Sequence, residues 1–481
     1  MAIEPKAAPL KRIKDGAPQV QKYKSGWTYG SSIGWGGETI LPNSAGGPLA
    51  CMAYLWEIDN KYDRFCTRAF SGSVYNFHLV VELPTGTMNS KFMDPKTHSQ
   101  TRFEKIRIQG FRRLKDVQFP LRPLCVMIGA NGLGKTSILD VISLLANSAQ
   151  GKLSSSITDL SGLSNILTYD DTDDLRLGIS MEVLYHEPLE YALRLKPQGV
   201  AYVIADETLT QKRKPNVPPF MHIDSRGLDV KYFQVEQGRL VRPNWEHNPL
   251  ETSLFQVPKM FKEPEEFRNR LSSSTFYHVL NVDPRSPVRM PQPMQPATLP
   301  GRNGEELVSC LFYLRETKRE RFEAIEDSIR SAFPRFDRLD FPPVAAGTLG
   351  LTWREHGFTK PLYMHQLSEG TLRFLWLATL LQSPGLTALT LIDEPEVSLH
   401  PELLSLLADL LREASTRSQL IVATHSDRLI RFLEPKEVLL MNSTEDGMTS
   451  VTWADQLDLT KWLEEYSLDE LWRNGRIGAR T

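Results

Sequence analysis

The sequence is poor in cysteine and carries almost no net charge. Its four cysteines stand apart from one another, with no C-x-x-C pair and no histidine cluster nearby (Cys51, Cys66, Cys125 and Cys310). This spacing argues against a disulfide framework and against a zinc site. Lysine plus arginine number 56 and aspartate plus glutamate 58, a formal net charge of -2. No overall positive field therefore attracts nucleic acid or an acidic membrane, and any such contact needs a local patch.

Long hydrophobic runs are also missing. Apolar residues do not continue for the roughly 20 positions that a membrane-spanning helix needs. The opening residues, MAIEPKAAPLKRIKDG, lack the apolar core of a secretory signal peptide. We therefore expect a cytoplasmic protein with no membrane partner.

Residues 1–92 differ in composition from the rest, being rich in glycine, serine and tryptophan without a sustained period. Three interpretations stay open. The segment is an accessory or partner-binding module anchored by Trp27, Trp35 and Trp56, or a poorly ordered extension, or natural translation starts at Met93. The chain length of 481 residues allows two or three ordinary domains, or one large domain with insertions.

Regular patterns begin near residue 103. Residues 103–111 and 114–121 alternate as half-buried strands, and residues 123–129 form the short apolar run of a buried strand. Residues 136–149 repeat apolar side chains at helical spacing. Further strand patterns, separated by short turns, predict an antiparallel sheet (175–184, 189–197 and 200–209).

A proline-dense connector, residues 265–304, is predicted to be irregular. Residues 305–333 then resume a helix with a predicted buried stripe (Leu307, Leu311, Leu314, Phe322, Ile325 and Ile329). Its KRER cluster, residues 318–321, is either a solvated face, which we favour, or a nucleic-acid contact.

A glycine-rich turn lies between the buried strand and the helix, and it fits the pattern G-x-x-x-x-G-K-[ST]. Glycines let backbone N–H groups approach phosphate oxygens, and the start of the helix adds partial positive charge. Lys135 is expected to neutralise the β- and γ-phosphates, and the Thr136 hydroxyl to hold Mg²⁺. The sequence thus predicts an ATP site that comprises Gly129, Ala130, Asn131, Gly132, Leu133, Gly134, Lys135, Thr136 and Ser137.

Two acids follow the apolar run at residues 389–392. A carboxylate at a strand end holds Mg²⁺, and its neighbour orients and deprotonates the attacking water. Asp393 takes the first role and Glu394 the second. Two acids after four apolar residues are also compatible with a plain strand end, but the glycine-rich turn upstream favours the catalytic interpretation.

His425 follows a third apolar run, residues 420–423. A neutral imidazole there can hydrogen-bond a γ-phosphate oxygen or the attacking water. A lone histidine is more often structural, yet this one lies about thirty residues after the acidic pair and at another strand end. We predict that His425, Glu394 and Lys135 are catalytic.

The stretch LSEG, residues 367–370, precedes a strongly apolar helix. One interpretation is an N-cap, in which Ser368 satisfies free N–H groups. The same geometry binds anions, so Ser368 and the Gly370 backbone are also candidates to hold a γ-phosphate.

In chain order, GANGLGKTS, LSEGTLR, LIDEPEVSLHP and ATHSD resemble the motifs of ABC-type ATPase heads of the SMC, RecF and OLD branch of AAA family ATPases. The resemblance runs from about Arg102 onward and is greatest to stand-alone bacterial ATPases. It implies that two heads sandwich ATP, with Ser368 and Gly370 of one copy completing the site of the other. It also implies that Arg112, in FRRL, lies near the nucleotide. No Q-loop glutamine is placed, although Gln198 and Gln211 are available.

The predicted fold class is α/β, a P-loop NTPase with an ABC-type head: a mixed central sheet flanked by helices, an antiparallel β subdomain and a helical insertion. The expected domains are the extension, two parts of the ATPase head and the β and helical insertion between those parts (1–92, 93–165, 341–481 and 166–340).

The preferred function is ATP binding and hydrolysis by a head that dimerises around ATP and acts as a conformational switch. The wider role proposed is anti-phage defence or DNA maintenance beside an effector protein. The alternative is a nucleotide-gated scaffold or sensor that restrains a partner or binds DNA, with hydrolysis incidental. ATP and Mg²⁺ are the expected cofactors, a second copy is the expected partner, and larger oligomers and DNA stay open.

Overall fold

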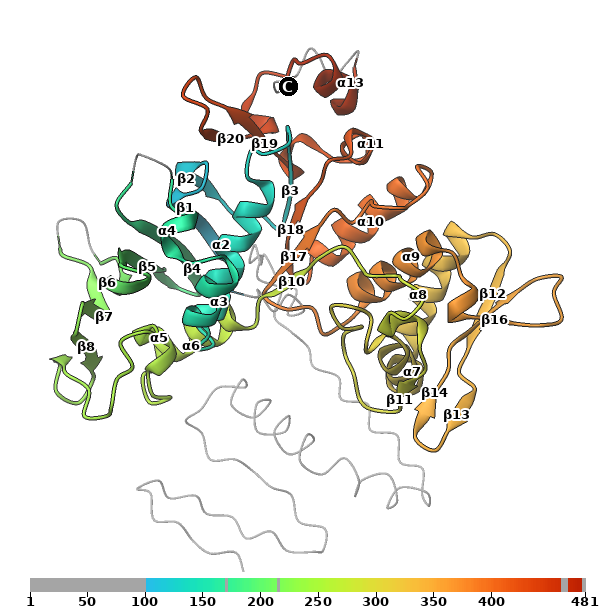
Figure 1. Cartoon of the computed structure of the whole chain (residues 1–481), viewed down its shortest axis with the longest axis horizontal. Helices are drawn as coiled ribbons and strands as arrows, with labels where there is room; N and C mark the ends of the chain where they lie inside the picture. Colours follow the sequence, from blue (N-terminus) through green and yellow to red (C-terminus); the bar gives the residue numbers. More distant parts are fainter. Residues whose placement is uncertain (1–100, 169–171, 214–216, 460–465, 478–481) are drawn as a thin grey trace, which may run out of the picture. The chain divides into compact units, whose positions relative to one another are not determined.

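Figure 1 shows the computed structural model, which describes residues 101–168, 172–213, 217–459 and 466–477. The chain divides into Met1–Met93 and a compact unit, Asp94–Thr481, and every described residue belongs to the second. All interpretations of residues 1–92, the start at Met93, and Cys51 and Cys66 lie outside the described residues. Cys125 and Cys310 are buried free thiols.

A six-stranded sheet in the order β10-β17-β18-β3-β19-β20 carries the motifs. Its strands are β3 (Leu124–Gly129), β10 (Thr275–Tyr277), β17 (Leu389–Asp393), β18 (Gln419–Ala423), β19 (Val438–Ser443) and β20 (Thr449–Trp453). All neighbours pair in parallel except β19 and β20. Parallel strands end at one edge of a sheet, so the residues after β3, β17 and β18 meet there.

Helices cover both faces of this sheet. Strand side chains alternate between faces, so Cys125 and Met127 pack in one core with α2 (Lys135–Ser148), while Val126 and Ile128 pack in a second core with α10 (Leu403–Ser415). Figure 1 shows α2 and α10 on either side of the central strands. The buried strand and the following helix, both predicted from the sequence, are confirmed.

A second, antiparallel sheet has the order β2-β1-β4-β5-β6-β7-β8-β9. Its strands are β1 (Phe103–Phe111), β2 (Leu114–Pro120), β4 (Leu175–Val183), β5 (His186–Gln198), β6 (Ala201–Gln211), β7 (Phe220–Arg226), β8 (Asp229–Gln234) and β9 (Arg239–Val241). The three predicted strands correspond to β4, β5 and β6, and their antiparallel pairing is confirmed. The strands predicted over 103–111 and 114–121 are also confirmed, as β1 and β2. The sheet is larger than predicted, because these two strands extend it at one edge and β7 to β9 at the other.

Short helices pack against α2 or this second sheet. They are α3 (Leu153–Asp159), α4 (Leu163–Ile166), α5 (Ser253–Gln256) and α6 (Lys262–Ser272). The interpretation of 265–304 as irregular is therefore wrong at its start, which lies in α6, and again at β10. Three residues are too few to show an alternation, which is why β10 left no sequence signal. The rest of that stretch holds only η2 (Pro287–Arg289) and β11 (Gln292–Pro293) within regular elements.

A helical region comprises α7 (Leu307–Thr317), α8 (Arg319–Ala332) and α9 (Glu369–Gln382), which pack on one another. The single helix predicted over 305–333 is wrong, because Lys318 leaves the helical conformation with φ -142° and ψ 62°. The break lets both helices bury their apolar stripes in one core, and all six predicted stripe residues are buried.

The remaining elements are short. Two small sheets have the orders β11-β14-β13 and β12-β15-β16. Their other strands are β12 (Phe336–Asp340), β13 (Pro343–Ala345), β14 (Thr348–Leu349), β15 (Thr352–Glu355) and β16 (Leu362–Tyr363). The other helices among the described residues are η3 (Met364–Gln366), α11 (Asp427–Ile430), η4 (Pro435–Glu437), η5 (Ala454–Gln456) and α13 (Leu468–Arg473). In the part of the chain that the structure describes, no helix has the length and apolarity needed to cross a bilayer. The predicted α/β architecture of mixed central sheet, antiparallel sheet and helical region is confirmed.

One buried side chain joins the two sheets. Gln419, at the start of β18, accepts a hydrogen bond from the Phe103 N–H at 2.7 Å and donates one to the Phe103 carbonyl at 2.7 Å. Phe103 opens β1, and both residues are buried. A single amide thus satisfies both backbone groups at the point where the antiparallel sheet meets the central sheet.

We expect Gln419→Leu to lower the free energy of unfolding by roughly 2–4 kcal/mol, because it leaves a buried N–H and a buried C=O without partners. Urea denaturation followed by tryptophan fluorescence measures the change. The matched control is Gln211→Leu, since the Gln211 amide donates to the Glu187 carbonyl at an exposed hairpin. Equal stability of the two variants would show that the Gln419 link contributes little.

Candidate nucleotide-binding site

The glycine-rich turn joins β3 to α2. Gly132 and Gly134 have φ angles of 78° and 85°, a left-handed conformation that glycine adopts without strain. Gly134 is the N-cap of α2, and no side-chain hydrogen bond within the described residues caps this helix start. A Cβ added to Gly132 would meet nothing within 4 Å, whereas one on Gly129 would lie 2.6 Å from the Met441 carbonyl oxygen. The turn is thus open beside Gly132, and free N–H groups with an open approach suit an anion.

Lys135 is buried at the start of α2. Its Nζ donates to the Gly129 carbonyl at 2.6 Å and to the Ala130 carbonyl at 3.1 Å. Burial lowers the pKa of Lys135 to about 8, against the opposite effect of the Glu394 and Asp393 carboxylates. The ammonium therefore stays mostly protonated at pH 7, held beside the turn by backbone carbonyls that a phosphate oxygen can replace.

The C-terminal ends of β17 and β18 are in register with the end of β3, where this turn begins. Asp393, the last residue of β17, pairs with Ala423 of β18, and Ala423 pairs with Met127 of β3. The acidic pair, the histidine segment and the glycine-rich turn therefore lie side by side along one edge of the central sheet. Sequence spacing predicted each strand end, and the pairing makes them neighbours.

Carboxylates crowd this edge. Burial raises the pKa of Asp393 to about 6, with further increases from Glu394, Asp140 and Glu396 and a decrease from Lys135. Such an excess of negative charge is stabilised by a cation.

The oxygen ligands available at this edge suit Mg²⁺. The Thr136 side chain is exposed at the start of α2, and Asp393 is half-buried at the end of β17. A hydroxyl and a carboxylate are the hard oxygen ligands that Mg²⁺ takes together with phosphate oxygens and water.

Glu394 and His425 face each other. The Nε2 atom of His425 lies 3.4 Å from Oε1 of Glu394. Burial and the nearby Lys135 lower the pKa of His425, and Glu394 opposes that shift, so the imidazole is neutral near pH 7. Glu394 has a φ of 46° and donates its N–H to the Ala423 carbonyl at 2.8 Å. A residue with a side chain seldom adopts this conformation, and such strain concentrates at functional sites.

Arg112 lies against the first turns of α2. Its Nη1 donates to Oδ2 of Asp140 at 2.6 Å and to Oγ of Ser137 at 3.2 Å. Its backbone is also in the left-handed region, with φ 48°. The guanidinium thus borders the helix start that follows the glycine-rich turn.

The LSEG turn lies elsewhere in the chain. Ser368 is exposed, and its Oγ accepts the Thr371 N–H at 3.2 Å, so it caps α9. A Cβ on Gly370 would lie 2.6 Å from the Ser398 carbonyl oxygen, so the start of α9 packs closely on the turn after β17. Helices α9 and α2 belong to different cores, on opposite faces of the central sheet. Within the described residues of one chain, the Ser368 side chain hydrogen-bonds to Thr371 and not to the glycine-rich turn.

Comparison with protein families matches residues 124–431 to a family described as "AAA domain, putative AbiEii toxin, Type IV TA system". The chain belongs to this AAA domain family. A comparison with curated proteins gave no match.

The AAA domain protein is also similar to solved structures of SMC heads. A structure titled "Crystal structure of the SmcHead bound to the C-winged helix domain of ScpA" is 19% identical, covers 73% of this chain and 97% of that one, and has a TM-score of 0.46. The Smc head with an extended coiled coil bound to the C-terminal domain of ScpA, derived from Pyrococcus furiosus, has 17% identity, coverages of 76% and 99%, and a TM-score of 0.45. The SMC head domain from Thermotoga maritima has 15% identity, coverages of 73% and 98%, and a TM-score of 0.38.

Two carboxylates of this AAA domain were missed at the sequence level. Asp140 stands four residues after Thr136, a spacing that places both on one face of α2, and this was a usable signal. Glu396 stands two residues after Glu394 in a turn, where spacing predicts no common direction. Only the tertiary structure shows that Glu396 contacts the segment that carries His425.

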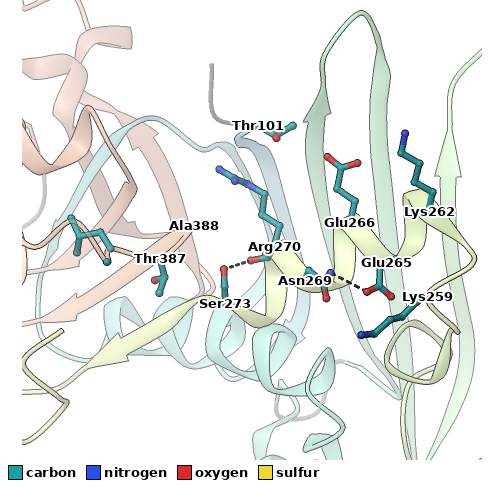
Figure 2. Close-up of a pocket in the computed structure, with 12 residues that line it drawn as sticks. Thr101, Lys259, Lys262, Glu265, Glu266, Asn269, Arg270, Ser273, Thr387 and Ala388 are labelled. Atoms are coloured by element: carbon teal, nitrogen blue, oxygen red, sulfur yellow. Dashed lines mark hydrogen bonds between the residues drawn. The ribbon is translucent and has the colours of Figure 1, made fainter. Parts of the chain in front are cut away.

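A hollow of about 790 Å³ lies at a different edge of the central sheet. It is bounded by α6 and by residues 385–388, which precede β17, whereas the site follows β17. Figure 2 shows Lys262, Glu266 and Arg270 along α6, with Thr387 and Ala388 across from the end of that helix. The hollow is therefore separate from Lys135 and Asp393.

Proposed function

We propose that this AAA domain protein binds ATP with Mg²⁺ and hydrolyses it, and that two copies close on the nucleotide. The observation that carries the proposal is the meeting of Lys135, Asp393, Glu394 and His425 along one sheet edge, from three neighbouring strand ends. A phosphate-binding turn, a cation site and a candidate base within one charged cluster are what phosphoryl transfer to water requires.

Each residue has a distinct role in this proposal. The N–H groups of the turn from Gly129 to Ser137 bind the phosphates, and Lys135 exchanges its carbonyl partners for phosphate oxygens. Thr136 and Asp393 would hold Mg²⁺, which when bound supplies positive charge that stabilises the triphosphate during transfer.

Glu394 accepts a proton from the attacking water, and neutral His425 donates or accepts a hydrogen bond beside it. Arg112 supports the start of α2 through its contacts with Asp140 and Ser137.

Phosphate release by the purified full-length chain with ATP and Mg²⁺ tests the activity. Turnover that stops when EDTA removes the metal supports hydrolysis as proposed. Tight ATP binding without turnover, in the presence or absence of DNA, would instead favour the alternative of a nucleotide-gated scaffold.

The dimer proposal rests on Ser368, which caps an exposed helix start on the opposite face of the sheet from the glycine-rich turn. We expect Ser368→Asp to keep the cap but to repel a γ-phosphate presented by a second copy, so that ATP still binds while the ATP-dependent dimer weakens. Light scattering with ATP measures the dimer. Ser368→Asn, which caps equally well without the charge, is the control, and equal dimerisation of both variants would contradict a role for Ser368 in the dimer.

Mixing two inactive variants tests the shared site more directly. A Lys135→Met chain retains Ser368, and a Ser368→Asp chain retains Lys135. If the site is built from two copies, the mixture recovers part of the turnover that each variant lacks alone. No recovery, with mixed dimers present, would contradict a shared site.

The family description names a toxin of a type IV toxin–antitoxin system, which supports a role beside a partner protein. We therefore extend the proposal to a switch that an effector or antitoxin reads through the nucleotide-dependent dimer, in anti-phage defence or DNA maintenance. Co-purification of the full-length chain with the product of a neighbouring gene, with and without ATP, tests this extension.

A further inference from the structure

Glu396 links two of the strand ends that build the site. It stands in the turn after β17, and its Oε1 faces the segment after β18. That oxygen accepts hydrogen bonds from the Thr424 hydroxyl at 2.6 Å, the His425 N–H at 3.0 Å and the Ser426 N–H at 3.2 Å. One carboxylate oxygen therefore receives donors from three consecutive residues.

These contacts bear directly on His425. The backbone of its segment has two other attachments. The Thr424 N–H donates to the Met127 carbonyl at 3.1 Å, and the Ser426 N–H also donates to the Thr424 hydroxyl oxygen at 2.9 Å. The His425 N–H has Glu396 as its acceptor. Beyond that point the imidazole reaches Glu394, with 3.4 Å between Nε2 and Oε1. The position of the imidazole thus depends on where Glu396 holds the backbone.

The surroundings of Glu396 disfavour its charged form. Burial raises its pKa, the donors from Thr424 and His425 lower it, and the neighbouring Glu394 raises it. Its second oxygen, Oε2, is buried and has no hydrogen-bond partner among the described residues. A carboxylate that has one buried oxygen without a partner and stands beside other carboxylates lowers the stability of the fold.

We propose that Glu396 is a positioning residue, which holds His425 against Glu394 so that the imidazole and the carboxylate act on the same water. This inference rests on the proposed hydrolysis. Glu396 does not itself contact the reacting atoms, and its effect passes through the backbone of residues 424–426.

The test compares Glu396→Ala with Glu396→Gln in the full-length chain. The glutamine oxygen can accept the same hydrogen bonds, whereas alanine leaves the N–H groups of His425 and Ser426 without that acceptor. We expect kcat to fall roughly ten- to a hundred-fold in Glu396→Ala, as for other small displacements of a catalytic group. We expect KM for ATP to stay within about two-fold, and Glu396→Gln to restore most of kcat.

A double variant separates positioning from a general structural effect. If Glu396 acts through His425, then Glu396→Ala adds little to the loss caused by His425→Ala. Losses that multiply, or an unchanged kcat in Glu396→Ala alone, would overturn the proposal.

Hydrogen exchange gives a readout that does not require turnover. The amide of His425, whose acceptor is Glu396, should exchange faster in Glu396→Ala, while those of β18 stay protected. If the wild-type chain hydrolyses no ATP, the proposed function fails, and unchanged exchange of the His425 amide would separately refute the positioning role.

Discussion

Glu394→Gln is expected to reduce the turnover number by about 10²- to 10⁴-fold, the range for loss of a general base. The glutamine has nearly the same size and tolerates the same backbone, so the left-handed conformation at residue 394 and the N–H bond to Ala423 are retained. What is lost is the ability to accept a proton beside His425. Phosphate release under saturating ATP measures the change.

The same variant should still bind ATP, because Lys135 and the glycine-rich turn are untouched. Since hydrolysis would no longer separate the copies, Glu394→Gln is expected to accumulate as an ATP-bound dimer in light scattering. Glu323→Gln, on the exposed side of α8, is the charge-matched control and should behave as the wild type. Normal turnover by Glu394→Gln would remove Glu394 from the role of base.

Lys135→Met is expected to weaken ATP binding by roughly 30-fold to more than 1,000-fold, the effect of removing one member of a buried, hydrogen-bonded charge pair. Methionine fills similar space without charge, so the loss reports the missing contact with phosphate. Titration with a fluorescent ATP analogue measures the dissociation constant.

The fold should survive this substitution. Burial lowers the pKa of Lys135, so the folded chain disfavours the charged ammonium, and replacing it with an uncharged side chain removes that unfavourable contribution. We therefore expect the melting temperature without nucleotide to change by only a few degrees, with Lys105→Met, at an exposed position of β1, as the control. Unaltered ATP affinity in Lys135→Met, with the fold intact, would contradict the proposed site.

Features that depend only on residues close together in the chain were predicted correctly from the sequence. The buried strand, the turn with Gly132 and Gly134, and the helix that follows are local features, since a turn of this kind requires glycine wherever it occurs. Of the two interpretations of Ser368, the N-cap is confirmed, because it depends on a residue three positions away, while the contact with a γ-phosphate stays a prediction.

Errors arose where local pattern and packing disagree. The stripe from Leu307 to Ile329 is periodic on both sides of Lys318, so the sequence favours one helix, and only the shared core forces a break there. β10 is a three-residue strand that exists because β17 offers it a parallel edge. Neither the shared core nor the open edge of β17 can be inferred from a window of neighbouring residues.

The sequence by itself determined the chemistry available to this protein: a lysine in a glycine-rich turn, an acidic pair after one apolar strand and a histidine after another. Tertiary structure alone decided that Glu394 meets His425 and that Glu396 holds the histidine segment. The reason is physical, because hydrogen-bond pairing between parallel strands aligns residues hundreds of positions apart, and side-chain direction in the connecting turns follows from packing rather than from spacing.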